Sequence, residues 1–115
     1  MISLLDKMWM QYIVGAIILM MDNKKVGQLE YEENRIIFLH VEKDYRSRGY
    51  GSLLLDQYAN LIKDKGIQNI QVTSATTSTG FYRKNGFVSV AEYRALSWTN
   101  WLTPVFRHVN MIKAL

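Results

Sequence analysis

The chain has 115 residues, of which 49% are hydrophobic, and it contains one proline, seven glycines and no cysteine. This composition argues against disorder and predicts one domain over residues 1–115, while the lack of cysteine excludes disulfides, thiolate catalysis and zinc sites built on cysteine. The net charge of +4 is uneven, because residues 1–34 carry three basic and five acidic side chains and residues 35–115 carry eleven and five.

An apolar run, Tyr12 to Met21, lies near the N-terminus. Its ten residues fall well short of the roughly 20 that a membrane-spanning helix needs. It also lacks the basic start and the small-residue cleavage site of a signal peptide. The run therefore predicts a buried strand, Ile13 to Met21, with no membrane partner, and the default location is cytoplasmic.

Two further strand-like segments follow. The residues Asp22 to Lys25 predict a turn, and Val26 to Glu32 alternates partly between apolar and polar side chains. A second tight turn at Glu33-Asn34 leads into the apolar segment Arg35 to Val41. Together these segments predict a three-stranded antiparallel meander.

A helix and a parallel strand are predicted next. Apolar residues fall on one helical face between Ser52 and Lys65, at Leu54, Leu55, Tyr58, Leu61 and Ile62. Gly66 ends this helix, and Ile67 to Val72 reads as a buried strand. A strand, a helix and a strand in this order predict a parallel pair with a right-handed crossover.

The C-terminal part predicts a short helix and a hairpin. Phe81 to Phe87 is typical of a last helical turn that is capped by Gly86 and returns to the core at Phe87. Beyond it, Ser89 to Leu96 and Phe106 to Ile112 predict an antiparallel pair around the loop Ser97 to Pro104. Within that loop Trp98 and Trp101 either line an acceptor pocket or fill the core, with packing favoured.

The turn between Val41 and Ser52 concentrates arginine and glycine. It reads Arg46-Ser47-Arg48-Gly49-Tyr50-Gly51 and stands before a predicted helix. Free N–H groups and the helix dipole make a helix N-terminus attractive to anions, and glycine lets a ligand approach the backbone. The turn predicts a phosphate site, although glycines also serve turns that need only a positive φ angle.

Two motifs carry a family resemblance. Arg46-x-x-Gly49-x-Gly51 resembles the acyl-CoA pyrophosphate loop of the GNAT superfamily of N-acetyltransferases, and Tyr82-Arg83-Lys84-Asn85-Gly86-Phe87 resembles the tyrosine-containing segment of those enzymes. The resemblance runs from about Ile36 to Phe87. It implies an α/β (α+β) fold with a mixed, largely antiparallel central sheet, a parallel β-α-β cofactor-binding unit and flanking helices.

The resemblance also implies site residues. The donor would be acetyl-CoA, with its pantetheine arm along the backbone of Leu39 and Val41; plain core packing is the alternative for these two residues, and both interpretations can hold together. Tyr82 would protonate the departing thiolate, and its alternative is a tyrosine packed beside Phe81 and Phe87. The residues expected at the pyrophosphate are Arg46, Ser47, Arg48, Gly49, Tyr50, Gly51 and Ser52.

The general base is not evident. The family often places carboxylates at the positions that correspond to Arg35 and Gln71, and neither residue is a base. His40 is the candidate substitute, because histidine titrates near neutral pH, with a hydrogen-bonded core histidine as its alternative. The cluster Glu30, Glu32 and Glu33 is either an acidic rim for a cationic amine or a solvated hairpin. No metal-ligand cluster is evident, and His108 has no argument beyond its residue type.

The resemblance favours acetyl transfer to a primary amine of a small molecule, peptide or protein. The alternative is a non-catalytic acyl-CoA-binding sensor or scaffold, which the missing carboxylates favour. Nucleic acid is not an expected partner, because no run of basic residues follows one face. Many family members carry helices that wall the acceptor site, and none is predicted here before the first strand, so we expect an open acceptor side or one that is closed in a homodimer.

Overall fold

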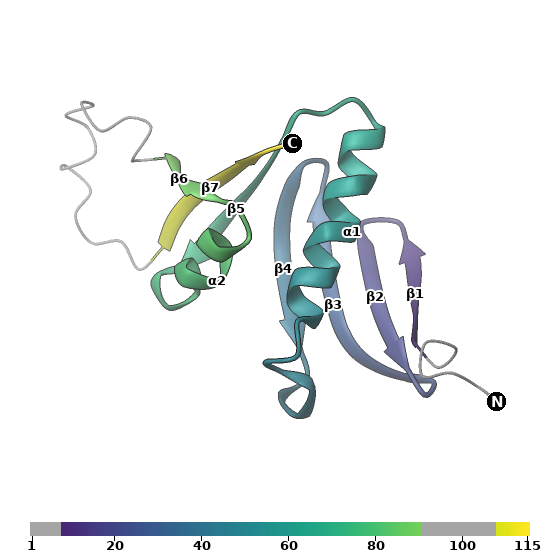
Figure 1. The fold of residues 1–115 in the computed structure, drawn as a ribbon. Coiled ribbons are helices and arrows are strands. Elements are labelled where there is room, and N and C mark those ends of the chain that lie inside the picture. Colours follow the sequence, from purple (N-terminus) through teal and green to yellow (C-terminus); the bar gives the residue numbers. More distant parts are fainter. Residues whose placement is uncertain (1–7, 91–107) are drawn as a thin grey trace.

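The computed structural model describes residues 8–90 and 108–115, which form one sheet with two helices (Figure 1). The strand order is β1-β2-β3-β4-β5-β7-β6, and every neighbouring pair is antiparallel except β4 and β5. This confirms the predicted mixed, largely antiparallel sheet with one parallel β-α-β unit. The strands are β1 (Met8–Ile13), β2 (Ala16–Met21), β3 (Lys24–Glu32), β4 (Arg35–Val41), β5 (Asn69–Ala75), β6 (Val88–Ser89) and β7 (His108–Ala114).

The N-terminal part corrects the predicted meander. The single strand predicted from Ile13 to Met21 is a hairpin, because the chain turns at Val14 and Gly15 and β1 pairs with β2 along its whole length. Gly15 has a φ of 77°, which a residue without a Cβ adopts readily. The turn at Glu33 lies where the sequence predicts it, and the turn predicted from Asp22 to Lys25 is confined to Asp22 and Asn23, because β3 already begins at Lys24. The meander therefore has four strands instead of three.

Helix α1 (Tyr50–Asp64) begins two residues before its predicted start, and its apolar stripe faces the sheet. Leu54, Leu55, Tyr58 and Ile62 are buried. The chain leaves the helix through Gly66, whose φ is 80°, while the Ile67 N–H donates to the Ile62 carbonyl at 3.3 Å. This is the hydrogen bond of a Schellman C-cap, and it supports the predicted role of Gly66.

The short helix α2 (Thr79–Lys84) ends in the same way. Gly86 has a φ of 92°, and the Phe87 N–H donates to the Tyr82 carbonyl at 3.0 Å. Phe87 is 2% exposed, so it returns to the core as the sequence predicts. Strand β6 then pairs antiparallel with β7. The predicted loop Ser97 to Pro104, with Trp98 and Trp101, lies outside the described residues.

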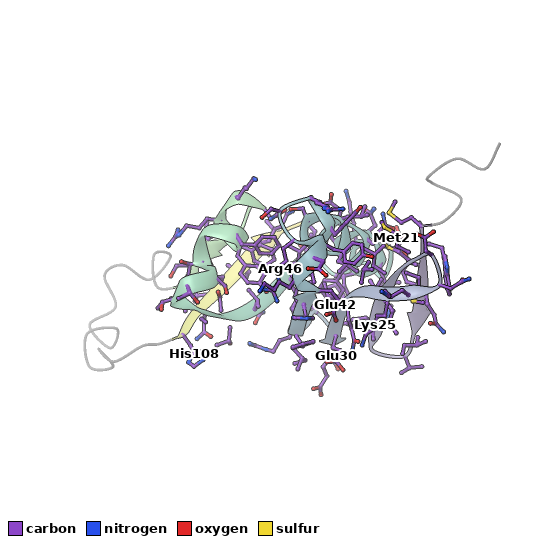
Figure 2. All side chains as sticks on the ribbon, turned by 90° about the horizontal axis from the view of Figure 1, so that it is seen from below. Met21, Lys25, Glu30, Glu42, Arg46 and His108 are labelled. Atoms are coloured by element: carbon purple, nitrogen blue, oxygen red, sulfur yellow. The ribbon has the colours of Figure 1, made fainter. Side chains whose placement is uncertain are left out.

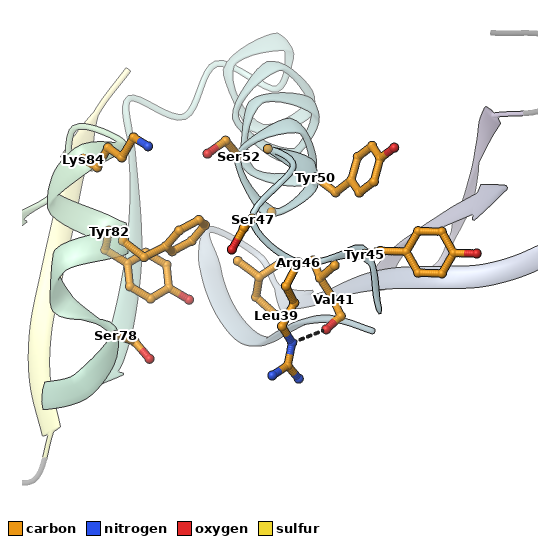
Figure 3. Close-up of a pocket in the computed structure, with 13 residues that line it drawn as sticks. Leu39, Val41, Tyr45, Arg46, Ser47, Tyr50, Ser52, Ser78, Tyr82 and Lys84 are labelled. Carbon is orange, nitrogen blue, oxygen red and sulfur yellow. Dashed lines mark hydrogen bonds between the residues drawn. The ribbon is translucent and has the colours of Figure 1, made fainter. Parts of the chain in front are cut away.

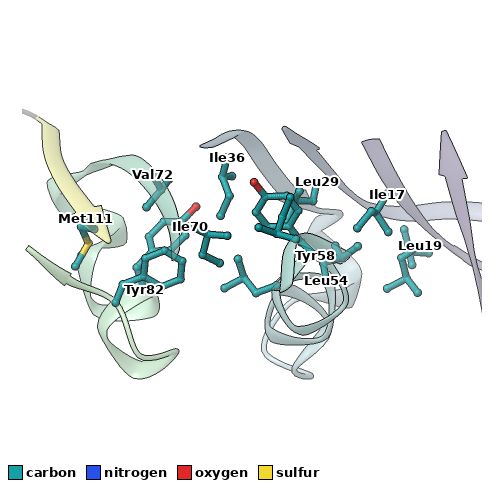
Figure 4. Packing of buried hydrophobic residues seen from close by; sticks show 14 residues of the cluster. Ile17, Leu19, Leu29, Ile36, Leu54, Tyr58, Ile70, Val72, Tyr82 and Met111 are labelled. Atoms are coloured by element: carbon teal, nitrogen blue, oxygen red, sulfur yellow. The ribbon is translucent and has the colours of Figure 1, made fainter. Parts of the chain in front are cut away.

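Both helices lie on one side of the sheet, and the core fills the space between them and the strands (Figures 1 and 4). It extends from Met111 and Tyr82 beside α2 to Ile17 and Leu19 at β2. Within residues 8–90 and 108–115 no helix covers the opposite side, from which Glu30 and His108 project (Figure 2). We call this side the open face.

Strands β4 and β5 pair over only two positions, Arg35 with Gln71 and Ile36 with Val72, and then diverge (Figure 1). The rest of β4, residues 37–41, has no β5 partner in the described sheet. Two 3₁₀ turns, η2 (Lys43–Tyr45) and η3 (Thr76–Ser78), follow the diverging strand ends. No helix in the described part of the chain is both long and apolar enough to cross a membrane.

Candidate functional site

A cavity of about 620 Å³ opens between the end of β4, the N-terminus of α1 and helix α2 (Figure 3). It brings together the two motifs that lie more than thirty residues apart in the sequence. Every residue predicted for the cofactor or for catalysis lines it, except His40 and Arg48. The lining residues are Leu39, Val41, Tyr45, Arg46, Ser47, Gly49, Tyr50, Gly51, Ser52, Ser78, Phe81, Tyr82 and Lys84.

The loop before α1 presents backbone N–H groups. Gly49 is the N-cap with a φ of 85°, and no side chain caps the helix. The Leu53 N–H donates to the Gly49 carbonyl at 3.0 Å, so the N–H groups of residues 50–52 precede the first bond of the helix. Together with the dipole of a 15-residue helix, they make this end of the cavity suitable for an anion.

The basic residues of the loop differ in their contacts. The Arg46 Nε donates to the Val41 carbonyl at 2.8 Å, which ties the loop to the end of β4 (Figure 3). The Arg48 guanidinium lies 5.7 Å from the centre of the Tyr45 ring and outside the cavity lining. Lys84, on α2, is the second basic side chain that lines the cavity, after Arg46. Because no acidic side chain lines the cavity, its local charge is positive.

Tyr82 is 7% exposed and lies between two other aromatic rings. The centres of the Phe81 and Phe87 rings are 5.2 and 5.3 Å from its own, both in edge-on contact. Burial raises the pKa of Tyr82 above the ordinary value, so its phenol is protonated at neutral pH. The residue thus has both of its predicted features, namely aromatic packing and a hydroxyl group beside the cavity.

His40 does not line the cavity. It alternates with Leu39 and Val41, which do, and therefore projects from the open face. Its Nε2 lies 3.7 Å from the Glu42 carboxylate, and its ring stacks on Phe38 with centres 5.9 Å apart. His40 is thus paired with a carboxylate beside the diverging strands, and 39% of its side chain is exposed.

The positions where the family often has carboxylates hold a hydrogen-bonded pair. The Arg35 guanidinium donates to the Gln71 side-chain oxygen at 3.0 Å and to the Thr73 hydroxyl at 3.1 Å. Glu30 and Glu32 are exposed on β3. In the described ranges no three His, Asp or Glu side chains gather as metal ligands.

Four lining residues were not predicted from the sequence: Tyr45, Ser78, Phe81 and Lys84. Tyr45 and Ser78 belong to the 3₁₀ turns that follow the diverging strands. These two residues reach the cavity because β4 and β5 separate. The local sequence does not predict how far two strands separate. Phe81 is predicted to pack beside Tyr82, and both Phe81 and Lys84 line the cavity.

The amino-acid sequence matches a known family over most of its length. Residues 4–113 match the family described as "Acetyltransferase (GNAT) domain". The chain belongs to this GNAT family. The match covers nearly the whole chain and confirms the resemblance that the two motifs carry. A protein of Bacillus subtilis (strain 168) named "Putative acetyltransferase" is 32% identical over 50 residues, which are 44% of this chain and 34% of that protein.

Solved GNAT structures share the fold. The PaiA N-acetyltransferase from Thermoplasma acidophilum, in complex with coenzyme A, matches with a TM-score of 0.66 at 20% identity, over 87% of this chain and 60% of that one. A "putative streptothricin acetyltransferase" from Bacillus anthracis str. Ames, in complex with acetyl coenzyme A, matches with a TM-score of 0.67 at 20% identity, over 87% and 61%. The chain thus spans less than two thirds of either protein.

Proposed function

We propose that residues 1–115 form a single-domain, acetyl-CoA-dependent N-acetyltransferase that acetylates a primary amine of a small molecule, peptide or protein. One observation carries the proposal: a single cavity combines a helix N-terminus, an unpaired strand edge and a buried phenol. These are the three elements that an acyl-CoA thioester requires, because its pyrophosphate, its amide-containing arm and its sulfur leaving group lie in this order along the molecule.

The residues of the cavity fit the donor substrate. The backbone N–H groups of residues 50–52 and the charges of Arg46 and Lys84 suit the pyrophosphate. The unpaired edge of β4 at Leu39 and Val41 can hydrogen-bond an extended amide chain as an added strand would. Gly51 lets the Phe81 ring pack close to the start of α1, because a Cβ at that position would lie 3.0 Å from this ring. The coenzyme A and acetyl coenzyme A complexes of the two similar structures support this assignment.

The proposed chemistry is direct transfer. The neutral amine attacks the thioester carbonyl, and main-chain donors near Val41 stabilise the oxyanion that forms. This attack forms the C–N bond. The oxyanion then collapses, the C–S bond breaks and Tyr82 gives its proton to the departing thiolate, while the proton that the nitrogen still has to lose passes through water to restore the phenol. The Tyr82 phenol carries its proton at neutral pH, as a tyrosine with a pKa at or above the ordinary value of about 10 does.

A primary amine with a pKa of about 10.4 must lose a proton before or during attack. We assign this proton to His40, directly or through water, because His40 lies on β4 beside the gap between the diverging strands, with the Glu42 carboxylate 3.7 Å from its Nε2. In this arrangement the donor occupies the helix side of the sheet and the amine approaches from the open face, between β4 and β5.

A second function, acyl-CoA binding without transfer, is favoured by one observation. The residues that line the cavity include no aspartate, glutamate or histidine, so a base can act only from outside the cavity. A sensor of this kind would bind acetyl-CoA at the same residues. It would release no thiol in the presence of any amine.

Calorimetry with acetyl-CoA, followed by thiol release against a panel of amines and peptides, tests both functions. We expect binding, acceptor-dependent release, and a kcat that falls about 100-fold or more in Tyr82→Phe with an unchanged acetyl-CoA Kd. Tyr45→Phe is the matched control, because it removes a hydroxyl group from another tyrosine that lines the cavity. Binding without release across the panel would favour the sensor, and no binding at millimolar acetyl-CoA would refute both functions.

A further inference from the structure

A row of hydrogen-bonded side chains crosses the open face where β4 and β5 meet. Arg35 donates to the side chains of Gln71 and Thr73 on β5, and the Thr73 hydroxyl donates to Asn110 on β7 at 2.8 Å. The Asn69 side chain extends the row, 3.4 Å from the Gln71 amide nitrogen. Arg35 is the positively charged residue of this row, and its hydrogen-bond partners Gln71 and Thr73 are uncharged.

Among residues 8–90 and 108–115, no carboxylate forms an ion pair with Arg35. Its cross-strand partner on β3 is Glu32, and no ion pair joins the two, because the guanidinium reaches over β5 instead. Two hydrogen bonds fix the plane of the guanidinium and leave its other donors available to solvent on an exposed residue. A fixed guanidinium with free donors is suited to bind a carboxylate through two parallel bonds.

The position of Arg35 connects it to acetyl transfer. Arg35 and Gln71 form the first of the two β4–β5 pairs, and Thr73 lies one residue beyond the second pair. The guanidinium therefore stands at the point from which the strands diverge, on the face opposite the cavity. An amine that approaches the cavity between the diverging strands from the open face passes close to it.

We propose that Arg35 binds a carboxylate group of the acceptor, so that the acceptor class is amines that also carry a carboxylate, as amino acids do. This rests on the proposed N-acetyltransferase function. The Arg35 guanidinium anchors the carboxylate, Gln71 and Thr73 hold the guanidinium in place, and the amine reaches into the gap between the strands. The same charge repels polycationic peptides.

The first test needs no catalysis. N-acetylglycine and N-acetylglycinamide, which differ only in the carboxylate, are titrated into the protein while NMR follows the Arg35 Nε–H and the side-chain amides of Gln71 and Asn110. We expect saturable shifts with N-acetylglycine alone, and their loss in Arg35→Gln. Lys25→Gln is the matched control, since it removes another exposed cation from a neighbouring strand and should keep the shifts. Equal responses to the two compounds, or none, would overturn the proposal.

The second test uses turnover. Matched pairs of an amino acid and its primary amide serve as acceptors, and we expect kcat/KM to favour the acid about 10- to 100-fold, the range of one charged hydrogen-bonded contact. Arg35→Gln should remove this preference and leave the acetyl-CoA Kd unchanged, whereas preference for the amide in the wild type would overturn the proposal. Failure of acetyl-CoA to bind in calorimetry would refute the proposed function separately, and the NMR titration would still decide on the carboxylate site.

Discussion

Gly49 and Gly51 lie two residues apart in the same loop, but the structure gives them different roles. Gly49 needs its left-handed φ of 85°, and a Cβ there would meet no atom within 4 Å. Gly51 lies inside the helix, and a Cβ there would press on the Phe81 ring. The sequence predicts that both glycines matter for phosphate binding. It does not show that one is needed for its backbone conformation and the other for the lack of a side chain.

We therefore expect the two alanine variants to differ in stability. Gly49→Ala should lower the free energy of unfolding by about 1–2 kcal/mol, the cost of a side chain in the left-handed region. Gly51→Ala gains helix propensity of about 0.5–1 kcal/mol, which offsets the displacement of Phe81 and keeps the net change small. Urea unfolding of both variants measures the difference, and a larger loss for Gly51→Ala would contradict this account.

Tyr58 is fully buried, and its hydroxyl donates to the Glu33 carbonyl at 2.9 Å. Burial, and secondarily the neighbouring Tyr31, raises the pKa of Tyr58 well above its ordinary value near 10. The folded protein therefore keeps this phenol neutral at a pH where the unfolded chain ionises it. The stability that this contributes is fully present below about pH 10 and is lost as the pH rises toward the folded pKa.

Stability should consequently fall above pH 10, by up to about 1.4 kcal/mol per pH unit for each such phenol. Tyr58→Phe should be less stable at pH 7 by about 1 kcal/mol, because it loses a buried hydrogen bond, yet its stability should fall less steeply above pH 10. Urea unfolding at a series of pH values measures both effects. Leu55→Ala controls for destabilisation alone, and an equally shallow slope in that variant would exclude Tyr58 as the cause.

Among the elements, α1 is the one that the sequence predicts best. Its apolar residues follow the helical period and Gly66 marks its end, so local information suffices. The β1–β2 hairpin is the failure. Apolar residues stand on both sides of the turn, up to Val14 before Gly15 and from Ala16 after it. The pattern of hydrophobicity therefore shows no break at the turn. The sequence alone does not tell whether a glycine adopts a positive φ.

The position of α1 depends on its contact with β3. If Gly27 carried a Cβ, that atom would lie 3.1 Å from the Leu54 side chain, so the helix approaches the sheet at a glycine. Leu54→Ala should cost about 2–5 kcal/mol of unfolding free energy, whereas Asn60→Ala, on the exposed side of the same helix, should change it by less than about 0.5 kcal/mol.

A double-mutant cycle in urea unfolding separates this contact from general destabilisation. In the Leu54→Ala background, Gly27→Ala should cost less than it does alone, because the truncated side chain makes room for the new methyl group. Strictly additive costs would show that the close approach of α1 to β3 does not depend on this pair.

At the scale of the whole molecule, the sequence predicts the order of the elements from β3 to α2 and the two motifs that meet at the cavity. It does not predict where β4 and β5 part. The apolar pattern of Ile36 to Val41 is the same whether or not a neighbouring strand pairs with it. The shape of the cavity depends on how distant strands are arranged. Gly49 and Tyr82 belong to local motifs and could be predicted, whereas Ser78 and Tyr45 belong to no such motif and were not.

The short β4–β5 pairing has a further consequence for the energetics of the fold. Two residue pairs join the backbone of β1–β4 to that of β5–β7, and the cavity draws its lining from both parts. Any molecule that fills the cavity holds the two parts together, and it adds a free energy of RT ln(1 + [L]/Kd) against their separation. We therefore expect the proposed acyl donor, when bound, to make the two parts unfold more cooperatively. Hydrogen exchange at the amides of β5 and β7 should therefore slow when the donor is added, even when no acetyl group is transferred.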